Sequence, residues 1–153
     1  MDLHPDFRDL LAEFAREGVS YAVVGGYAVG HHAKPRATKD LDLLVSASGN
    51  NLERAARALE NFGAAPNLVA AIRNLGETEV VYLGVPPVRV DILRSADGID
   101  DVDATLNRAI QASLGDLTIP ILALDDLITN KRAAGRAQDL ADVALLERVR
   151  DRK

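Results

Sequence analysis

The sequence has no cysteine, no tryptophan and few other aromatic residues, and each absence excludes a class of site. Without cysteine, the 153-residue chain can form neither a disulfide nor a zinc site with thiolate ligands. Aromatic residues make up only 4% of the chain, so it lacks the stacking platform of single-stranded nucleic-acid binders. No apolar run approaches the roughly 20 residues that a membrane-spanning helix needs.

The charge and composition are those of an ordinary globular protein. The formal net charge of -5 argues against tight non-specific DNA binding, although it leaves room for a local basic groove. The first residues, MDLHPDFRDLL, are acidic and amphipathic, unlike a signal peptide. With 48% hydrophobic residues, the chain can bury a sizeable core. We therefore expect a cytoplasmic protein with no membrane partner and a single domain spanning residues 1–153.

The order of predicted elements mixes strands and helices without regular alternation. Apolar periodicity predicts helices near residues 7–14, 52–62 and 104–112, and strands at 19–24, 40–45, 79–83 and 88–93. Residues 117–122 are predicted to form an edge strand, because Pro120 cannot donate to a ladder. Two helices, 125–134 and 137–150, close the chain on either side of Gly135. The predicted fold class is α+β, a mixed β-sheet with helices packed on one face.

The stretch from Ser20 to Ser46 carries the first candidate site residues, Asp40 and Asp42. It reads as a buried strand, a glycine pair, a short helix, a basic connector and a second strand. Because side chains alternate along a strand, Asp40 and Asp42 lie on one face and Leu41 on the other. Two such carboxylates are suitable ligands for a hard divalent cation. An Asp-x-Asp pair alone also fits a solvated strand end.

The glycine pair Gly25–Gly26 lies between the first strand and the short helix. Without side chains there, backbone N–H groups can approach phosphate oxygens, and the following helix offers its positive end. The pair alone fits an ordinary tight turn equally well. The dinucleotide-binding pattern G-x-G-x-x-G and the P-loop pattern are both absent, which argues against those two folds.

A third carboxylate, Asp91, lies within the predicted strand VRVDIL. Alternation puts Asp91 and Arg89 on one face of this strand, and Val90 with Ile92 on the other. A third carboxylate on a separate strand can complete a metal site or accept the proton of an attacking hydroxyl group. Arg36 and Thr38 lie just before the first carboxylates, where they could contact a triphosphate or form a solvated connector.

These blocks, in this order, resemble the DNA polymerase β-like nucleotidyltransferase superfamily. The finer pattern, with GG, R-x-T-x-D-x-D and the late KRAAGRAQDLADVALL, is similar to small nucleotidyltransferases related to AbiEii-type toxins. The resemblance covers residues 20 to 150. It implies a nucleoside triphosphate donor such as ATP and a Mg²⁺ or Mn²⁺ cofactor. It also implies the following roles: Asp40, Asp42 and Asp91 as catalytic residues and metal ligands, and Gly25, Gly26, Arg36, Thr38 and Lys131 as phosphate-binding residues.

The chain differs from the family pattern at one position of the predicted site. Many members have Gly-Ser where this chain has Gly25–Gly26, so only backbone amides can contact the donor phosphate there. Asp139 matches an acidic position of the late block and is expected to play a structural role, orienting Lys131 or Arg136. The neighbouring His31 and His32 point in different directions on a helix and are expected to be non-catalytic.

The predicted function is metal-dependent transfer of a nucleoside monophosphate to a hydroxyl acceptor. The acceptor stays open between RNA such as a tRNA end, protein, and a small molecule such as an antibiotic. The toxin-like resemblance favours a macromolecule and implies an antitoxin partner. The alternative from another class is a catalytically silent nucleotide-binding or interaction module with the same fold.

Overall fold

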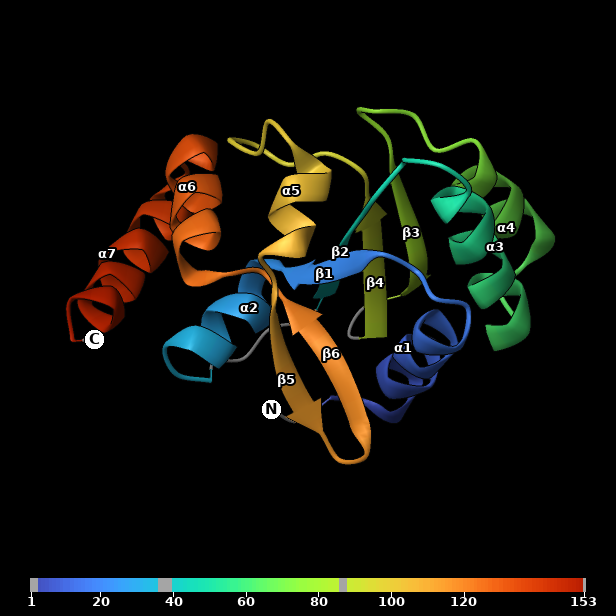
Figure 1. The fold of residues 1–153 in the computed structure, drawn as a ribbon, viewed down its shortest axis with the longest axis horizontal. Coiled ribbons are helices and arrows are strands. Elements are labelled where there is room, and N and C mark those ends of the chain that lie inside the picture. Colours follow the sequence, from blue (N-terminus) through green and yellow to red (C-terminus); the bar gives the residue numbers. More distant parts are fainter. Residues whose placement is uncertain (1–2, 36–39, 86–87, 153) are drawn as a thin grey trace.

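The computed structural model describes residues 3–35, 40–85 and 88–152, which form one six-stranded sheet and its surrounding helices (Figure 1). The helices are α1 (Pro5–Arg16), α2 (Gly25–His32), α3 (Asn51–Phe62), α4 (Pro66–Arg73), α5 (Val102–Asn107), α6 (Leu124–Ala134) and α7 (Ala137–Asp151). The strands are β1 (Tyr21–Val24), β2 (Asp40–Val45), β3 (Val80–Val85), β4 (Val88–Leu93), β5 (Ile110–Leu114) and β6 (Leu117–Ile121). Among the described residues, no helix is both long and apolar enough to cross a membrane.

The sheet is mixed, with the strand order β3-β4-β2-β1-β6-β5. Strand β2 pairs antiparallel with β1 and parallel with β4, so it lies in the middle of the sheet. The parallel register puts Asp42 directly opposite Asp91. The chain between these strands forms α3, α4 and β3 before it returns beside β2. The sheet therefore brings together two segments that are distant in sequence.

The core lies on the side of β2 and β4 opposite to their polar residues. Leu41 and Leu43 of β2 and Ile92 of β4 have no exposed surface. Helix α1 buries Phe7, Leu10, Leu11 and Phe14, the helical spacing that the sequence predicts. Burying each of these side chains contributes about 1.5–3 kcal/mol. This apolar layer fixes which face of each strand the carboxylates occupy.

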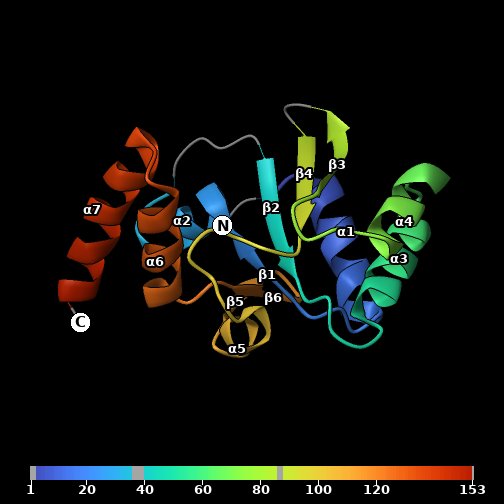
Figure 2. The same cartoon turned by 90° about the horizontal axis from the view of Figure 1, so that it is seen from above.

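The predicted α+β class and mixed sheet are confirmed. Helices α1, α3 and α4 lie at one side of the molecule and α6 and α7, with α2 beside them, at the other (Figure 2). The strands lie between these groups, and α5 lies apart from both. Strands β2 and β4 have the predicted bounds, and α4 is a helix that the sequence pattern did not predict. The two C-terminal helices are separated by Gly135, which has a left-handed backbone as a helix end requires.

Two predictions near the sheet's far edge are wrong. The predicted helix at 104–112 ends at Asn107, and residues 110–114 form β5 instead. The strand with Pro120 is not an edge strand, because β6 lies between β1 and β5. Strand β6 pairs with β1 only at Val23–Ile121, so the ladder to β1 needs no donor from Pro120. The hairpin with β5 supplies the pairing that the isolated sequence pattern could not reveal.

Candidate active site

The three predicted carboxylates lie on one face of two neighbouring strands. Asp40 and Asp42 are on β2, and Asp91 is on β4. The register pairs Asp40 with Arg89 and Asp42 with Asp91. Residues paired in this way point to the same side of a sheet, so the four side chains form one cluster. The structure therefore brings together the carboxylates that the sequence selects.

Asp42 is the most perturbed of these groups. Burial, followed by the negative charges of Asp91 and Asp40 and a hydrogen bond with Asp91, raises the pKa of Asp42 to about 7. The positive charge of Lys131 acts in the opposite direction. A carboxyl group in this environment needs either a proton or a cation beside it. This is the electrostatic setting of a cation-binding carboxylate.

Gly25 packs directly against Asp42 at the start of α2. A Cβ atom on Gly25 would overlap the Oδ2 atom of Asp42 and lie 3.1 Å from its Cγ atom. The φ angle of Gly25 is also +69°, a conformation that side chains disfavour. In the part of the chain that the structure describes, no side chain caps the N-terminus of α2. The N-terminus of α2, which begins at Gly25, therefore lies beside Asp42. Backbone N–H groups at a helix N-terminus have no partner within the helix.

Arg89 joins the carboxylates of the two strands. Its Nη2 atom donates to Asp40 Oδ2 at 2.8 Å and to Asp91 Oδ2 at 3.1 Å. Its Nε atom donates to Asp91 Oδ1 at 2.8 Å, and its guanidinium carbon lies 4.9 Å from the centre of the Tyr82 ring. Sequence reasoning assigned no role to Arg89. The signal was present, since alternation already put Arg89 on the face of Asp91.

Lys131 is held in a second cluster on α6 and α7. Its Nζ atom lies 3.1 Å from Asp139 Oδ1 and 3.2 Å from Asp142 Oδ2. All three side chains are buried. Asp139 also accepts hydrogen bonds from Arg136, which is the main reason that the pKa of Asp139 is lowered to about 2. Sequence reasoning missed Asp142, although it lies one helical turn after Asp139.

The predicted orienting contacts of Asp139 are therefore present, with both Lys131 and Arg136. Lys131 is close enough for its charge to lower the pKa of Asp42. The pKa of Arg136 is raised mainly by its hydrogen bonds to Asp139, and the charge of Asp42 makes the smallest contribution. The ammonium group of Lys131 therefore acts on the carboxylates, although Asp139 and Asp142 offset its charge. Arg36 and Thr38, the other predicted phosphate-binding residues, lie outside the described residues.

The carboxylates fit a divalent metal in their donor chemistry. Carboxylate oxygens are the ligands that Mg²⁺ and Mn²⁺ prefer. A cation here would also reduce the repulsion between Asp42 and the like-charged Asp91. Among the described residues, however, no group of three His, Asp or Glu side chains is arranged to hold a metal as it stands. The guanidinium group of Arg89 lies between Asp40 and Asp91.

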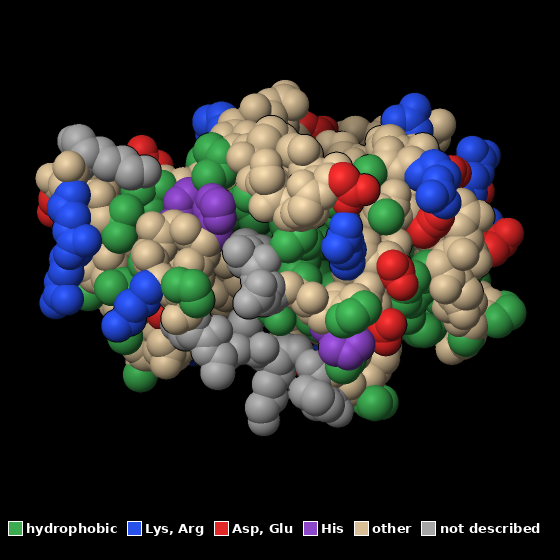
Figure 3. All heavy atoms as spheres, turned by 90° about the horizontal axis from the view of Figure 1, so that it is seen from below, with side chains coloured by type: hydrophobic (Ala, Val, Ile, Leu, Met, Phe, Trp, Pro, Cys, Tyr) green, Lys and Arg blue, Asp and Glu red, His purple; other side chains and the backbone are tan. Residues whose placement is uncertain are grey.

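Other polar features have structural explanations. Asp101, just before α5, caps the helix by accepting from the Ala104 N–H at 3.0 Å. Asp103, in the first turn of α5, accepts from Ser46 and Ser48. His32 Nε2 lies 2.7 Å from the Leu122 carbonyl oxygen, which ties α2 to the end of β6. Among the described residues on the face seen in Figure 3, Lys and Arg side chains are interspersed with acidic and uncharged ones.

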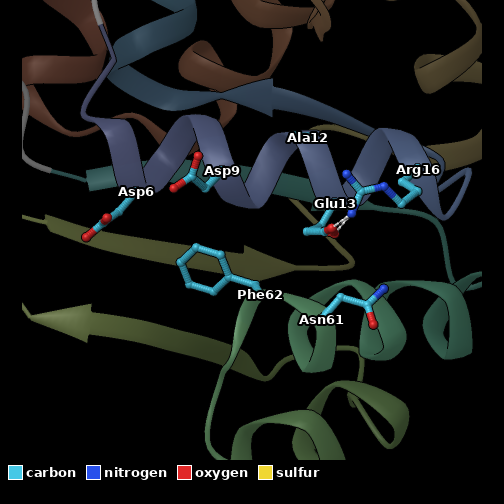
Figure 4. A pocket seen from close by; sticks show the side chains of 7 residues that line it. All are labelled: Asp6, Asp9, Ala12, Glu13, Arg16, Asn61 and Phe62. Atoms are coloured by element: carbon cyan, nitrogen blue, oxygen red, sulfur yellow. Dashed lines mark hydrogen bonds and ion pairs between the residues drawn. The ribbon is translucent and has the colours of Figure 1, made fainter.

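A hollow of about 500 Å³ lies between α1 and the end of α3, away from the carboxylate cluster (Figure 4). Its walls carry Asp6, Asp9 and Glu13 on α1 and Phe62 on α3. Glu13 is already paired with Arg16. None of the predicted site residues that the structure describes lines this hollow.

Comparisons with known proteins agree with the geometry. A family model described as "Nucleotidyl transferase AbiEii toxin, Type IV TA system" matches residues 9–152. A search of curated protein sequences finds no match. Among solved structures, the chain is similar to the lincosamide antibiotic adenylyltransferase LnuA, at 15% identity and a TM-score of 0.59, covering 96% of this chain and 98% of that one.

Two further solved structures share the fold. The antibiotic-resistance factor ANT(2'')-Ia matches at 12% identity and a TM-score of 0.59, over 95% of this chain and 85% of that one. A nucleotidyltransferase from Thermotoga maritima, itself assigned only by inference, matches at 14% identity and a TM-score of 0.59, over 96% and 91% of the two chains. At these identities the likeness establishes the fold alone.

Proposed function

The chain belongs to the AbiEii nucleotidyltransferase toxin family, and from this premise we propose which acceptor and which residues its reaction uses. The proposed reaction moves a nucleoside monophosphate from a nucleoside triphosphate to a hydroxyl group of RNA or protein. The observation that supports it most is the packing of Gly25 on Asp42, with the N-terminus of α2 beside the carboxylates. A triphosphate bound at that helix end would have its reacting phosphorus next to the acidic cluster.

The sheet order suggests where donor and acceptor bind. Helix α2 follows β1, whereas Asp91 is on β4, on the far side of β2. We therefore place the donor phosphates at Gly25 and Gly26 and the acceptor hydroxyl near Asp91. The hydroxyl oxygen forms a bond to the α-phosphorus, the bond from that phosphorus to the α–β bridging oxygen breaks, and pyrophosphate leaves. The hydroxyl proton passes to a carboxylate oxygen of Asp91.

Asp40, Asp42 and Asp91 are the residues that would hold Mg²⁺ or Mn²⁺. When bound, such an ion neutralises phosphate charge and lowers the pKa of the attacking hydroxyl group. Lys131 is paired with Asp139 and Asp142, so we assign it a role in setting the positive potential of the donor site. Arg136 has a more exposed side chain and is better placed to meet phosphate, as Arg36 and Thr38 are also predicted to be.

Label transfer tests this proposal. The purified protein is incubated with each α-³²P-labelled nucleoside triphosphate, Mg²⁺ or Mn²⁺, and either cell RNA or cell lysate. We expect label on RNA or protein with the wild type, and a loss of at least about 100-fold with Asp40→Asn and Asp42→Asn. Asp116→Asn, which alters an exposed aspartate in the β5–β6 turn, is the matched control and should transfer label normally.

Label transfer that persists in both site variants would overturn the site assignment. Binding of triphosphate by calorimetry without transfer to any acceptor would instead favour the silent binding module. Growth gives a third measure: the toxin role predicts that expressing the wild type slows growth and that expressing Asp42→Asn does not.

A small-molecule acceptor is the second candidate. It is favoured by the likeness to two antibiotic-modifying enzymes over nearly the whole of this chain. The same label-transfer assay with a lincosamide and an aminoglycoside as acceptors separates this candidate from the first. Labelled drug without labelled RNA or protein would replace the macromolecular acceptor with a small one while leaving the donor site as proposed.

A further inference from the structure

Arg89 occupies the same oxygen atoms that a metal ion at the carboxylate cluster would use. Its three hydrogen bonds engage Asp40 Oδ2 and both carboxylate oxygens of Asp91, at 2.8 to 3.1 Å. A cation coordinated by Asp40 and Asp91 must displace at least some of these bonds. We propose that Arg89 is an internal counter-cation that competes with the divalent metal for Asp40 and Asp91. This inference rests on the proposed role of these carboxylates as metal ligands.

The surroundings of Arg89 allow this exchange. The side chains of Arg89 and Asp40 are each 31% exposed, so water reaches the pair and its bonds are weak enough to open. The guanidinium group also lies over the ring of Tyr82, which is 53% exposed and opposite Asp91 in the β3–β4 register. Arg89 can therefore release the carboxylates and keep a favourable contact with the aromatic face.

The competition has a defined consequence for the order of binding. Three neighbouring carboxylates repel one another, and Arg89 offsets this repulsion without any metal. The same pairing lowers the affinity of the cluster for a free divalent ion. A metal ion that arrives with a triphosphate brings anionic oxygens, to which a released arginine can bind. The geometry thus favours loading by the metal–nucleotide complex over loading by the metal alone.

The test measures metal binding and needs no turnover. Free Mn²⁺ is followed by its electron paramagnetic resonance signal during titration of the full-length protein without nucleotide. We expect Arg89→Gln to bind Mn²⁺ about tenfold more tightly than the wild type. This variant lacks the hydrogen bonds of Arg89 to Asp40 and Asp91 and the positive charge that repels the metal ion. Arg89→Lys keeps the charge but loses the bidentate pairing of the guanidinium group with Asp91, so its affinity should rise by about threefold.

Arg73→Gln is the matched control. It removes an arginine that pairs with Glu53 on a remote helix and should leave Mn²⁺ affinity unchanged. In EDTA, Arg89→Gln should melt at a lower temperature than the wild type. Mg²⁺ should raise the melting temperature of Arg89→Gln by more than it raises that of the wild type. Circular dichroism shows whether Arg89→Gln folds in EDTA. If it does not, the Mn²⁺ affinity of Arg89→Lys is compared with that of the wild type instead.

Equal Mn²⁺ affinity of the wild type and both Arg89 variants, within twofold, would overturn the inference. Weaker binding by these variants would also overturn it, because the arginine would then be supporting the metal site. Label transfer by the wild type reports separately on the proposed function. Normal transfer with unchanged Mn²⁺ affinity would refute the competition alone, whereas no Mn²⁺ binding by any form, together with no transfer, would refute both.

Discussion

Two clusters in this protein each hold a basic side chain between two aspartates, but they differ in their contact with water. Lys131 lies between Asp139 and Asp142 on the C-terminal helix pair, with side chains that are 9%, 2% and 2% exposed. Arg89 lies between Asp40 and Asp91 on two strands, where water reaches it. Charges buried together cannot separate without a large desolvation cost, whereas partly exposed charges can exchange partners. Arg89 and Asp40 are each 31% exposed, and Asp91 is 14% exposed. The helix cluster is therefore a fixed part of the fold, and the strand cluster is one that a ligand can rearrange.

Asp42 belongs to the strand cluster and responds to the charges of both clusters. Burial and the other two aspartates of the strand cluster raise its pKa, and the lysine of the helix cluster lowers it. The pKa stays raised, at about 7, because burial and the two nearby carboxylates outweigh Lys131. One carboxyl group thus reports on how the two clusters are balanced.

Breaking the helix cluster should have the largest effect. Lys131→Met leaves Asp139 and Asp142 buried without their shared cation, which should reduce the free energy of unfolding by about 3–5 kcal/mol. Urea unfolding followed by circular dichroism measures this loss. Lys34→Met, which removes an exposed lysine, is the control and should change little. A loss below about 1 kcal/mol for Lys131→Met would mean that this cluster is as exchangeable as the other.

Replacing Asp42 should have the next largest effect, with the opposite sign. Its folded-state pKa of about 7 lies above the ordinary value of 3.8, so the wild type loses stability as pH rises from about 4 to 7. Asp42→Asn removes that penalty and should be more stable at pH 8 in EDTA, by roughly 2–4 kcal/mol, while transferring no label. Thermal unfolding at pH 5 and pH 8 checks the sign. A stability difference that is the same at both pH values would contradict the assignment.

Acid should weaken the helix cluster through Asp139. The folded-state pKa of Asp139, about 2, lies below the ordinary value of 3.8, so its contribution is complete above about pH 4 and is lost as pH falls toward 2. The shift corresponds to about 2 kcal/mol. Urea unfolding of the wild type and Asp139→Asn across this range isolates the effect. The advantage of the wild type over Asp139→Asn should shrink as pH falls, and a constant difference would refute this account.

A third ion pair, more exposed than either cluster, should contribute the least to the free energy of unfolding. Arg132 pairs with Glu147 between α6 and α7, with side chains 56% and 36% exposed. Arg132→Gln should change the free energy of unfolding by no more than about 0.5 kcal/mol. Raising the salt concentration from 50 mM to 500 mM should make this difference smaller still, because salt screens exposed charges. A loss above about 1.5 kcal/mol would show that exposure is a poor guide to the strength of these pairs.

The sequence was sufficient to predict the strands that carry the site. Alternation within residues 40–45 and 88–93 selected the polar face of each strand correctly, because a two-residue period is a local property. The family resemblance then identified the fold, and the family match supports it. The strand at 110–114 was missed because five residues with a mixed pattern become a strand only by pairing with β6.

The role of Arg89 could not be predicted in the same way. Whether Arg89 meets Asp40 depends on the register between β2 and β4, and no local pattern sets the register of two strands separated by three other elements. The raised pKa of Asp42 has the same origin, since it depends on burial and on Asp91 from another strand. The residue types of the site are thus readable along the chain, and their couplings appear only in the assembled sheet.

The parallel pairing of β2 with β4 also decides when during folding the site comes into existence. Closing the long segment between these strands costs chain entropy before any contact is gained, so such pairings form slowly. Asp42 meets Asp91 only when that closure is complete. A chain still leaving the ribosome, or one stalled in a partly folded state, has the residues of the site but not the site. The carboxylates of the candidate active site therefore come together only when the sheet is complete.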